Sequence, residues 1–404
     1  MPQLVHFLEE IPNPSVLHST SALDTYFEAP ESSVLHVYTE ADLIQLAKVA
    51  VDIEFPGVDG VDALLQLPEG RIRFTCVDST RHPPRRWMTL LNFLYDPHRR
   101  VFMDPYGAYD GLRQRRLDKD APSRWAGQSR AKMREPEGSA ETNVSVEKNM
   151  VSFGFRMDWR TIAEAALIIA RYDFSREFLD DLAVTLRPST SNNPSLPPIL
   201  QRDLLTQILE GSHAKRSFQL LKSTGFIEAH WPELVTMYDV GHSKEHHPEG
   251  DVWQHTLETF GYRKTADLVL GLGLLFHDSG KPMAKPAEGR LFDRHSQIGA
   301  RLTERFLRRL EFEGEIVRKA VFLVREHMLP SFIPELPTYR TEEVMASDLF
   351  PLLLELYRCD LSSTYRGPEG YYKACKIYRS FQKNLRNPYR HSDGRKIAKR
   401  GNER

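Results

Sequence analysis

The spacing of apolar positions changes character along the chain. Residues 34–39, VLHVYT, and 71–79, RIRFTCVDS, have the β-branched and aromatic composition that is typical of strands. Residues 40–50, EADLIQLAKVA, instead repeat apolar side chains at the spacing of a helix. Helical spacing then dominates in WRTIAEAALIIARYDF (159–174) and RDLLTQILEG (202–211). The pattern therefore predicts a mixed α and β region that is followed by mostly helical structure.

Composition divides this pattern further. The stretch after residue 112 is rich in charge, Pro, Gly and Ser, which favours an exposed loop or linker. The predicted regions are a mixed region (1–112), a charged linker or loop (113–150), a helical region (151–237), a helix-rich region with unusual histidines (238–385) and a basic tail (386–404). We interpret the chain as a multidomain α+β protein.

One apolar helix ends in an unusual pair of polar residues. The run VLGLGLLF (269–276) is apolar all round, as expected of a buried helix, and His277 and Asp278 follow it directly. We expect Gly280 to end the helix, which would place this pair in the last turn. A helix C-terminus carries partial negative charge and favours a cation. The arrangement suggests a metal site, although a single His–Asp pair is more often a hydrogen-bonded part of a core.

Four more candidate ligands strengthen the metal hypothesis. His255, His295, His327 and Asp360 lie on or beside expected helices within about a hundred residues of each other. Mixed imidazole and carboxylate ligands suit Mn, Fe, Co, Ni or Zn. Two aspartates, one of which is able to bridge, could hold a pair of ions.

Charge and cysteine usage exclude several classes of protein. The 404 residues carry a formal net charge of -1, so no global field indicates nucleic acid or a membrane as partner. The three cysteines share no metal-type spacing, and a disulfide framework is not expected. The N-terminus does not resemble a signal peptide, and the longest apolar run is too short to span a bilayer. We expect a cytoplasmic protein with no membrane contact and no reading of DNA sequence; RNA contact by the linker and the basic tail stays open.

The motifs of the helix-rich region resemble a known superfamily. HHPEGDVWQHT, LLFHDSGKP, FDRHSQIGA, REHM and LYRCDLSSTYRGPEGY occur in the order of the HD superfamily of metal-dependent phosphohydrolases. The region is most similar to the HD domain of some bacterial CCA-adding tRNA nucleotidyltransferases. The resemblance implies a primary metal site formed by His255, His277, Asp278 and Asp360. It also implies a second site completed by His295 and His327, with Asp278 bridging two divalent ions.

The resemblance leads us to expect a metal-dependent phosphohydrolase. Its substrate would be a nucleotide or RNA phosphoester, cleaved by 2′,3′-cyclic phosphodiesterase, 2′-nucleotidase or phosphatase activity. Asp278 and Lys281 would act in catalysis, because a metal-bound hydroxide attacks phosphorus and an ammonium stabilises the developing charge. Arg294 and Arg325 adjoin expected ligands and could bind phosphate, whereas a surface salt bridge is the alternative for each.

The first half resembles the head of the same nucleotidyltransferases more faintly. The segment MTLLNFLYDPHRRVFMDPYGAYDGLRQRRL (88–117) echoes the end of that head. Val34 and His36 stand where the family places the carboxylates that hold its Mg²⁺ ions. The resemblance therefore predicts a degenerate nucleotidyltransferase-like α/β head, a helical neck and an all-α HD domain.

Two alternatives to the hydrolase stay open. One is a tRNA nucleotidyltransferase that adds CCA and carries an accessory HD domain. The other is a non-catalytic RNA-binding or regulatory module.

Overall fold

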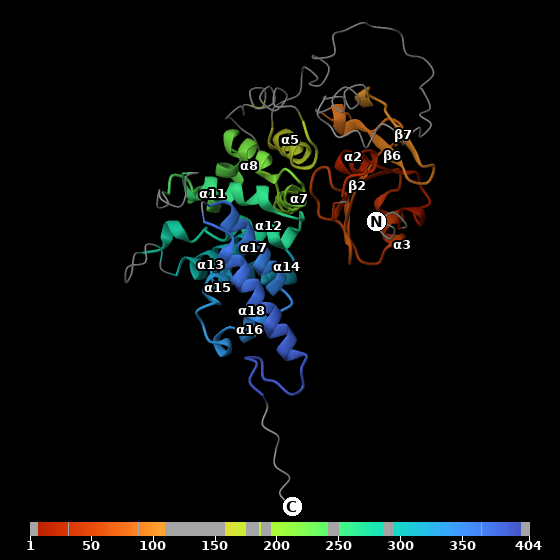
Figure 1. Ribbon diagram of the computed structural model, residues 1–404. Coiled ribbons are helices and arrows are strands. Elements are labelled where there is room, and N and C mark those ends of the chain that lie inside the picture. Colours follow the sequence, from red (N-terminus) through yellow and green to blue (C-terminus); the bar gives the residue numbers. More distant parts are fainter. Residues whose placement is uncertain are drawn as a thin grey trace, which may run out of the picture. The chain divides into compact units, whose positions relative to one another are not determined.

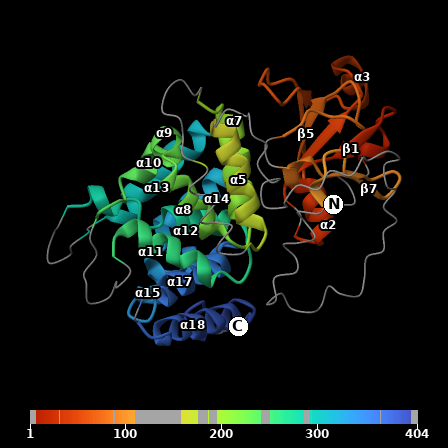
Figure 2. The ribbon, with the colours of Figure 1, turned by 90° about the horizontal axis from the view of Figure 1, so that it is seen from above.

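The structure of the protein is a computed structural model that divides into two compact units. It describes residues 7–30, 32–86, 89–109, 158–174, 186, 195–240, 250–285, 292, 294–364 and 366–396. Unit 1 comprises Met1–Gly211 and Gln219–Phe226, and unit 2 comprises Ser212–Phe218 and Ile227–Arg404. Figures 1 and 2 show a sheet among the elements of unit 1 and helices throughout unit 2. The chain is thus a mixed α and β protein, as the sequence predicts.

Unit 1 is built on a seven-stranded sheet in the order β3-β4-β5-β2-β1-β6-β7. The strands are β1 (Ser15–Leu17), β2 (Val34–Thr39), β3 (Ile53–Glu54), β4 (Ala63–Leu67), β5 (Gly70–Cys76), β6 (Leu94–Asp96) and β7 (Val101–Met103). Only β2 and β5 pair in parallel, with Val37 opposite Phe74, and the other pairs are antiparallel. Every residue of β2 is buried, which explains its almost continuous apolar sequence.

Two of the helices of unit 1, α3 (Leu43–Val49) and α5 (Trp159–Arg171), begin at side chains that cap them. The helices of this unit are α2 (Ser19–Phe27), α3, α5 and α7 (Pro198–Leu209), with the 3-10 turn η1 (Thr89–Asn92). Asp42 caps α3 by accepting from the Gln45 backbone amide at 2.8 Å, and Gln45 returns a bond to Asp42. Asp158 caps α5 in the same way. The helices predicted at residues 40–50, 159–174 and 202–211 are confirmed.

A buried ion pair joins α2 to the end of α5. Asp24 accepts hydrogen bonds from Arg171 Nε at 3.0 Å and Nη2 at 2.8 Å, and from the Tyr172 hydroxyl at 2.7 Å. The two charged side chains are 1% and 3% exposed. Burial raises the pKa of Asp24, and the adjacent guanidinium opposes that shift. The two-point contact with Arg171 favours the charged form of Asp24 and fixes how the two helices meet.

Unit 2 is a helical assembly around one apolar helix. It contains the helices α10 (Pro232–Val235), α11 (Val252–Thr259), α12 (Leu268–Phe276), α13 (His295–Arg309), α14 (Gly314–Glu326), α15 (Leu329–Phe332), α16 (Glu342–Met345), α17 (Phe350–Ser362) and α18 (Glu369–Leu385) and the 3-10 turns η4 (Phe260–Tyr262), η5 (Lys281–Met283) and η6 (Thr338–Arg340). The chain passes between the two units inside α8 (Ala214–Ser223) and again inside α9 (Phe226–His230). Helix α12 lies among α11, α13, α14 and α17, as Figure 1 shows. Its buried apolar sides account for the run 269–276.

The predicted domain limits stay predictions, because several lie outside the described residues. The charged segment 113–150 and residues 397–404 of the basic tail are not described. Helices α5 and α7 belong to the same unit as the sheet, although the sequence pattern suggested a separate helical region. Within the described residues, no helix is long and apolar enough to cross a membrane.

Candidate metal centre

Six side chains of unit 2 gather into two groups that could each hold a metal ion. The first group is His255, His277 and Asp360, and the second is Asp278, His295 and His327. Within each group, one ligand atom of every residue lies within 4.8 Å of the others. The structure therefore brings together all six ligands that the resemblance implies.

Five helices supply these ligands at positions that the local fold determines. His255 lies inside α11 and Asp360 inside α17, while His277 follows α12, His295 begins α13 and His327 follows α14. All four histidines are at least two-thirds buried. The helix ends carry most of the ligands, because there the chain can turn two neighbouring side chains, such as His277 and Asp278, toward one point.

The hydrogen bonds of the rings fix their tautomers. The Nδ1–H groups of His277, His295 and His327 donate to the backbone oxygens of Leu274, Phe292 and Val324 at 2.8, 2.9 and 2.7 Å. Each Nε2 therefore carries a lone pair. In imidazoles that bind a metal through one nitrogen, the other nitrogen typically donates a hydrogen bond in this way.

The Nδ1 atom of His255 faces a side-chain hydroxyl instead of a backbone oxygen. The Ser363 hydroxyl donates to the backbone oxygen of Asp360 at 2.7 Å, which uses its only proton. If His255 Nδ1 donates to that hydroxyl at 3.3 Å, its Nε2 lone pair faces Asp360 Oδ1 at 3.0 Å, and either a cation or a proton on Nε2 makes that contact favourable.

These lone pairs face each other, which is unfavourable without a cation. The two Nε2 atoms lie 3.1 Å apart in His295 and His327, and 3.4 Å apart in His277 and His255. Protonation offers no relief in the second group, because burial lowers the pKa of His295 and lowers that of His327 to about 3. A divalent cation accepting both lone pairs resolves the repulsion, so the donor set fits a metal ion.

Asp278 lies between the two groups. Its Oδ2 is 3.4 Å from His277 Nε2 and 3.7 Å from His255 Nε2. Its Oδ1 is 3.7 Å from His295 Nε2 and 3.9 Å from His327 Nε2. Burial would raise the pKa of this carboxyl, but Lys281 and the histidines lower it well below its usual range. The geometry is that of a carboxylate able to bridge two ions.

The three predicted cationic residues differ in their relation to the centre. Lys281 Nζ lies 2.6 Å from Asp278 Oδ2, and its side chain is 12% exposed. Arg294 precedes α13 with a left-handed backbone and is exposed. Arg325 is 53% exposed and pairs with Glu326 at 2.8 Å. Of the three, Lys281 contacts the centre directly, whereas Arg325 forms the surface salt bridge that we gave as its alternative.

Gly280 has a different role from the one that the sequence suggested. The helix α12 ends at Phe276, and Gly280 has an ordinary φ of -83°. A Cβ at this position would lie 2.0 Å from the backbone oxygen of His295 and 2.6 Å from the amide nitrogen of Gly299. Glycine is needed here because the turn after α12 packs directly against the start of α13, not because it ends the helix.

Replacing Gly280 with Ala is expected to push His295 away from the centre. The unfolding free energy should fall by about 1–3 kcal/mol, as for other overpacked sites. Binding of a second Mn²⁺ or Zn²⁺ per chain, measured by calorimetric titration, should weaken more than binding of the first. Gly261→Ala is the control, because a Cβ there meets nothing within 4 Å. Unchanged binding of both ions in the Gly280 variant would contradict this role.

In unit 1, the central strand offers no metal-binding carboxylate. Val34 and His36 both lie on β2 and are buried. His36 Nε2 pairs with Gln207 Oε1 of α7 at 3.1 Å. The acid of α7, Asp203, pairs with Arg71 at 2.8 Å and Arg73 at 3.5 Å. The residues of β2 include no carboxylate, and His36 makes a buried polar contact there; that this strand corresponds to the metal-binding strand of the family stays a prediction.

Two buried histidines of unit 1, His18 and His36, predict that its stability depends on pH. Burial lowers the pKa of His18 and of His36 well below 6.5, and Arg86 and Arg73 add to the effect. The unfolded chain then takes up protons below about pH 6.5 while the native state does not, so stability falls as the pH falls. The slope should approach about 1.4 kcal/mol per pH unit for each histidine. Urea unfolding at pH 7.5 and 5.5 should show it, and the slope should be smaller in His36→Gln; identical slopes would contradict the assignment.

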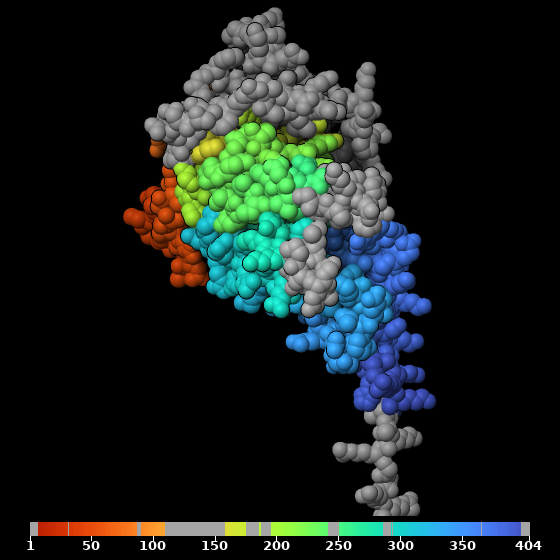
Figure 3. All heavy atoms as spheres, turned by 90° about the vertical axis from the view of Figure 1, so that its left-hand side faces the viewer, coloured from red at the N-terminus to blue at the C-terminus, as the bar shows by residue number. Residues whose placement is uncertain are grey.

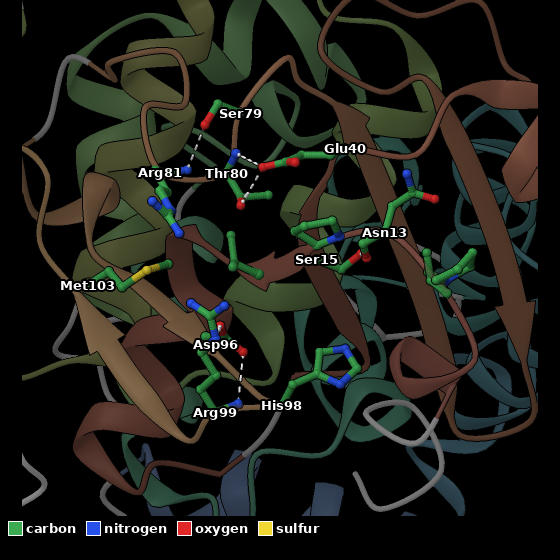
Figure 4. Close-up of a pocket in the computed structure, with 14 residues that line it drawn as sticks. Asn13, Ser15, Glu40, Ser79, Thr80, Arg81, Asp96, His98, Arg99 and Met103 are labelled. Atoms are coloured by element: carbon green, nitrogen blue, oxygen red, sulfur yellow. Dashed lines mark hydrogen bonds and ion pairs between the residues drawn. The ribbon is translucent and has the colours of Figure 1, made fainter.

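A cavity lies in unit 1, where β2 and β5 end (Figure 4). It has a volume of about 560 Å³, and Arg81, Arg99, Glu40 and Asp96 contribute to its lining. Glu40 accepts from the Thr80 amide at 2.7 Å, and Asp96 from the Arg99 amide at 3.0 Å. Sequence reasoning missed this cavity, since its residues are scattered from 11 to 103 without a motif. Its two acids and two arginines balance, so its charge does not select the sign of a ligand.

Curated proteins similar to this chain are tRNA nucleotidyltransferases. The A-adding tRNA nucleotidyltransferase of Deinococcus radiodurans is 33% identical over 177 residues, which are 42% of this chain and 40% of that protein. The multifunctional CCA protein of Xanthomonas campestris pv. campestris is 29% identical over 168 residues, 41% of this chain and 38% of that protein. The matches thus span about two fifths of these relatives. No protein-family model matches the chain.

Solved structures give a weaker likeness. The Bacillus stearothermophilus CCA-adding enzyme in complex with CTP has a TM-score of 0.46 at 13% identity, and covers 94% of this chain and 81% of that one. A tRNA nucleotidyltransferase complexed with a primer tRNA and an ATP analogue has a TM-score of 0.42 at 12% identity, covering 94% and 98%.

These relatives contradict the phosphohydrolase that we expected from the sequence. They are nucleotidyltransferases, which agrees with the alternative and not with the main expectation. The hydrolytic roles of Asp278 and Lys281 rested on that activity and are not retained. The physical reason for the error is that a ligand set predicts a bound cation, whereas the cation alone does not determine the reaction. The proteins similar to this chain are A-adding and CCA-adding tRNA nucleotidyltransferases.

Proposed function

We propose that this protein acts on the 3′ end of tRNA, as a tRNA nucleotidyltransferase of the A-adding or CCA-adding kind. The observation that carries the proposal is the 33% identity over 177 residues with an A-adding enzyme. The faint resemblance of residues 88–117 to the head of such enzymes supports it. Its cofactors would be divalent metal ions, and its partner would be tRNA.

We further propose that unit 2 is an HD-type helical domain that holds divalent ions. The support is the pair of ligand groups, whose four Nε2 lone pairs converge beside Asp278 and Asp360. His255, His277 and Asp360 would hold one ion, and His295 and His327 the other, with Asp278 between them. A bound ion would supply positive charge for an RNA phosphate, while Lys281 would add a further cation beside Asp278.

A second candidate is recognition of the tRNA end without nucleotide transfer. It is favoured by Val34 and His36, since transfer of this type needs two carboxylates on that strand to hold its ions. His36 is also buried at that position, and its Nε2 pairs with Gln207 Oε1 of α7. In this case unit 1 would contribute a binding surface.

One experiment separates the two candidates. Transcripts of tRNA that end before C74, C75 or A76 are incubated with the protein, CTP, ATP and Mg²⁺ or Mn²⁺, and the products are resolved on a sequencing gel. We expect extension, and the transcript that is extended identifies whether C or A is added. Mature tRNA and an RNA hairpin without an acceptor stem are the controls.

The outcomes have distinct meanings. Binding of the truncated tRNA without extension supports recognition alone. If the truncated tRNA is neither bound nor extended, both candidates are overturned.

A further inference from the structure

Cationic side chains collect along one face of α18. Eight Lys and Arg residues but only one acid, Asp393, lie between residues 370 and 396, although the whole chain has a net charge of -1. Lys376, Arg379, Lys383 and Arg386, here called the basic stripe, recur every three or four residues and are exposed. Such spacing places them on one side of a helix, about 5 Å apart along its axis. This local positive charge contrasts with the net charge of -1 of the whole chain.

The basic stripe is not neutralised by neighbours in the structure. Among the described residues, no salt bridge is formed by Lys376, Arg379, Lys383 or Arg386, whereas Arg395 pairs with Asp393 at 3.3 Å. Long side chains stand out from this blue end of the molecule in Figure 3. Four closely spaced cations without counter-charges repel one another, so a polyanion that binds them is stabilised.

A hollow of about 400 Å³ lies beside the stripe. Met345 and Phe381, both buried, and the half-buried Ile377 form its apolar wall. Lys373 and Lys376 line it as well, together with polar groups that include Ser380, Asn384 and Asp393, whose carboxylate pairs with Arg395. An apolar wall with amide and hydroxyl groups suits a flat heteroaromatic ring, and the two lysines suit the phosphate attached to it.

Exposed aromatic rings accompany the cations. Tyr372, one turn before Lys376 on the same face of α18, is 64% exposed, and Tyr389 after the helix is 75% exposed. Aromatic rings between cations are typical of surfaces that bind single-stranded nucleic acid, because each unpaired base can stack on a ring. A membrane is the poorer partner, because Ala374 and Phe381 of α18 are buried within unit 2 and Leu385 is the one aliphatic side chain described on this helix that is more than half exposed.

We propose that the exposed face of α18 binds single-stranded RNA, with the basic stripe on successive phosphates and the hollow holding one unstacked base. The proposal rests on the proposed function only in taking RNA as the polyanion. The proposal adds a binding surface in unit 2 that includes none of the six candidate metal ligands.

The test measures binding of a fluorescent twelve-residue oligouridine by anisotropy between 50 and 300 mM salt. Lys376→Ala/Lys383→Ala should lower the affinity by about tenfold and the slope of log K against log[salt] by about 1.4, that is, about 0.7 for each lost phosphate contact. Arg301→Ala/Arg305→Ala on α13 is the matched control, because both arginines are exposed and carry the same charge. Tyr372→Ala should lower affinity by about tenfold with an unchanged slope. A strand of abasic residues should bind more weakly than oligouridine.

Three results would overturn the proposal. The first is an equal loss of affinity for oligouridine in the stripe variant and the control variant. The second is equal affinity for abasic and normal strands. The third is binding of phosphatidylserine vesicles that depends on the stripe, without binding of RNA. The tRNA extension assay on the same variants keeps the two proposals apart. If wild type extends truncated tRNA and the stripe variant binds oligouridine as wild type does, the surface fails and the proposed function stands. If oligouridine binds through the stripe but truncated tRNA is neither bound nor extended, the surface stands and the function fails.

Discussion

Asp278→Asn is expected to abolish metal binding at both ligand groups. The substitution keeps the shape of the side chain but removes the charge that lies within 3.9 Å of all four Nε2 atoms. Wild type purified with Mn²⁺ or Zn²⁺ should contain close to two ions per chain by elemental analysis, and the variant should contain none. We expect this to be the largest single effect on the centre, because the Asp278 carboxylate lies within 3.9 Å of histidine nitrogens of both groups.

Stability provides a second readout of the same variant. At a metal concentration about one hundred times the Kd, binding should stabilise wild type by about 2.7 kcal/mol, or about 5–10 °C in Tm. EDTA should remove this gain from wild type and leave Asp278→Asn unchanged. Asp348→Asn is the matched control, since Asp348 is an exposed acid of the same unit. Normal metal content in Asp278→Asn would show that the two groups do not share this carboxylate.

Asp24→Asn is expected to cause the largest loss of stability in unit 1. The change leaves the Arg171 guanidinium, 3% exposed, without its carboxylate partner. Removing one member of a buried pair costs about 3–5 kcal/mol, because the remaining charge is desolvated and unpaired. The hydrogen bond from the Tyr172 hydroxyl to Asp24 is weakened in the same step. Urea unfolding followed by circular dichroism measures the loss as an earlier first transition.

An exposed ion pair of the same unit is the control for this prediction. Arg160 and Asp59 lie 2.7 Å apart, but their side chains are 41% and 87% exposed. Asp59→Asn should therefore change stability by about 1 kcal/mol or less. Equal losses in the two variants would mean that burial does not determine the strength of the Asp24–Arg171 pair.

The locally encoded features were accessible from sequence. The composition of β2 and β5 and the helical spacing of α3, α5 and α7 predicted their type, because backbone preference and side-chain periodicity are properties of short segments. The six candidate ligands were also identified from sequence, since their residue types are those that bind transition metals. The absence of carboxylates from β2 could be read directly from Val34 and His36.

Tertiary structure alone decided what depends on distant residues meeting. It grouped the ligands three and three, and it placed His255 within 3.0 Å of Asp360, 105 positions along the chain. It assigned Gly280 to a close approach of two segments and paired Asp24 with Arg171 across 147 positions. It also formed the hollow beside α18. Such contacts arise from packing of whole elements, and local periodicity contains no information about which elements meet.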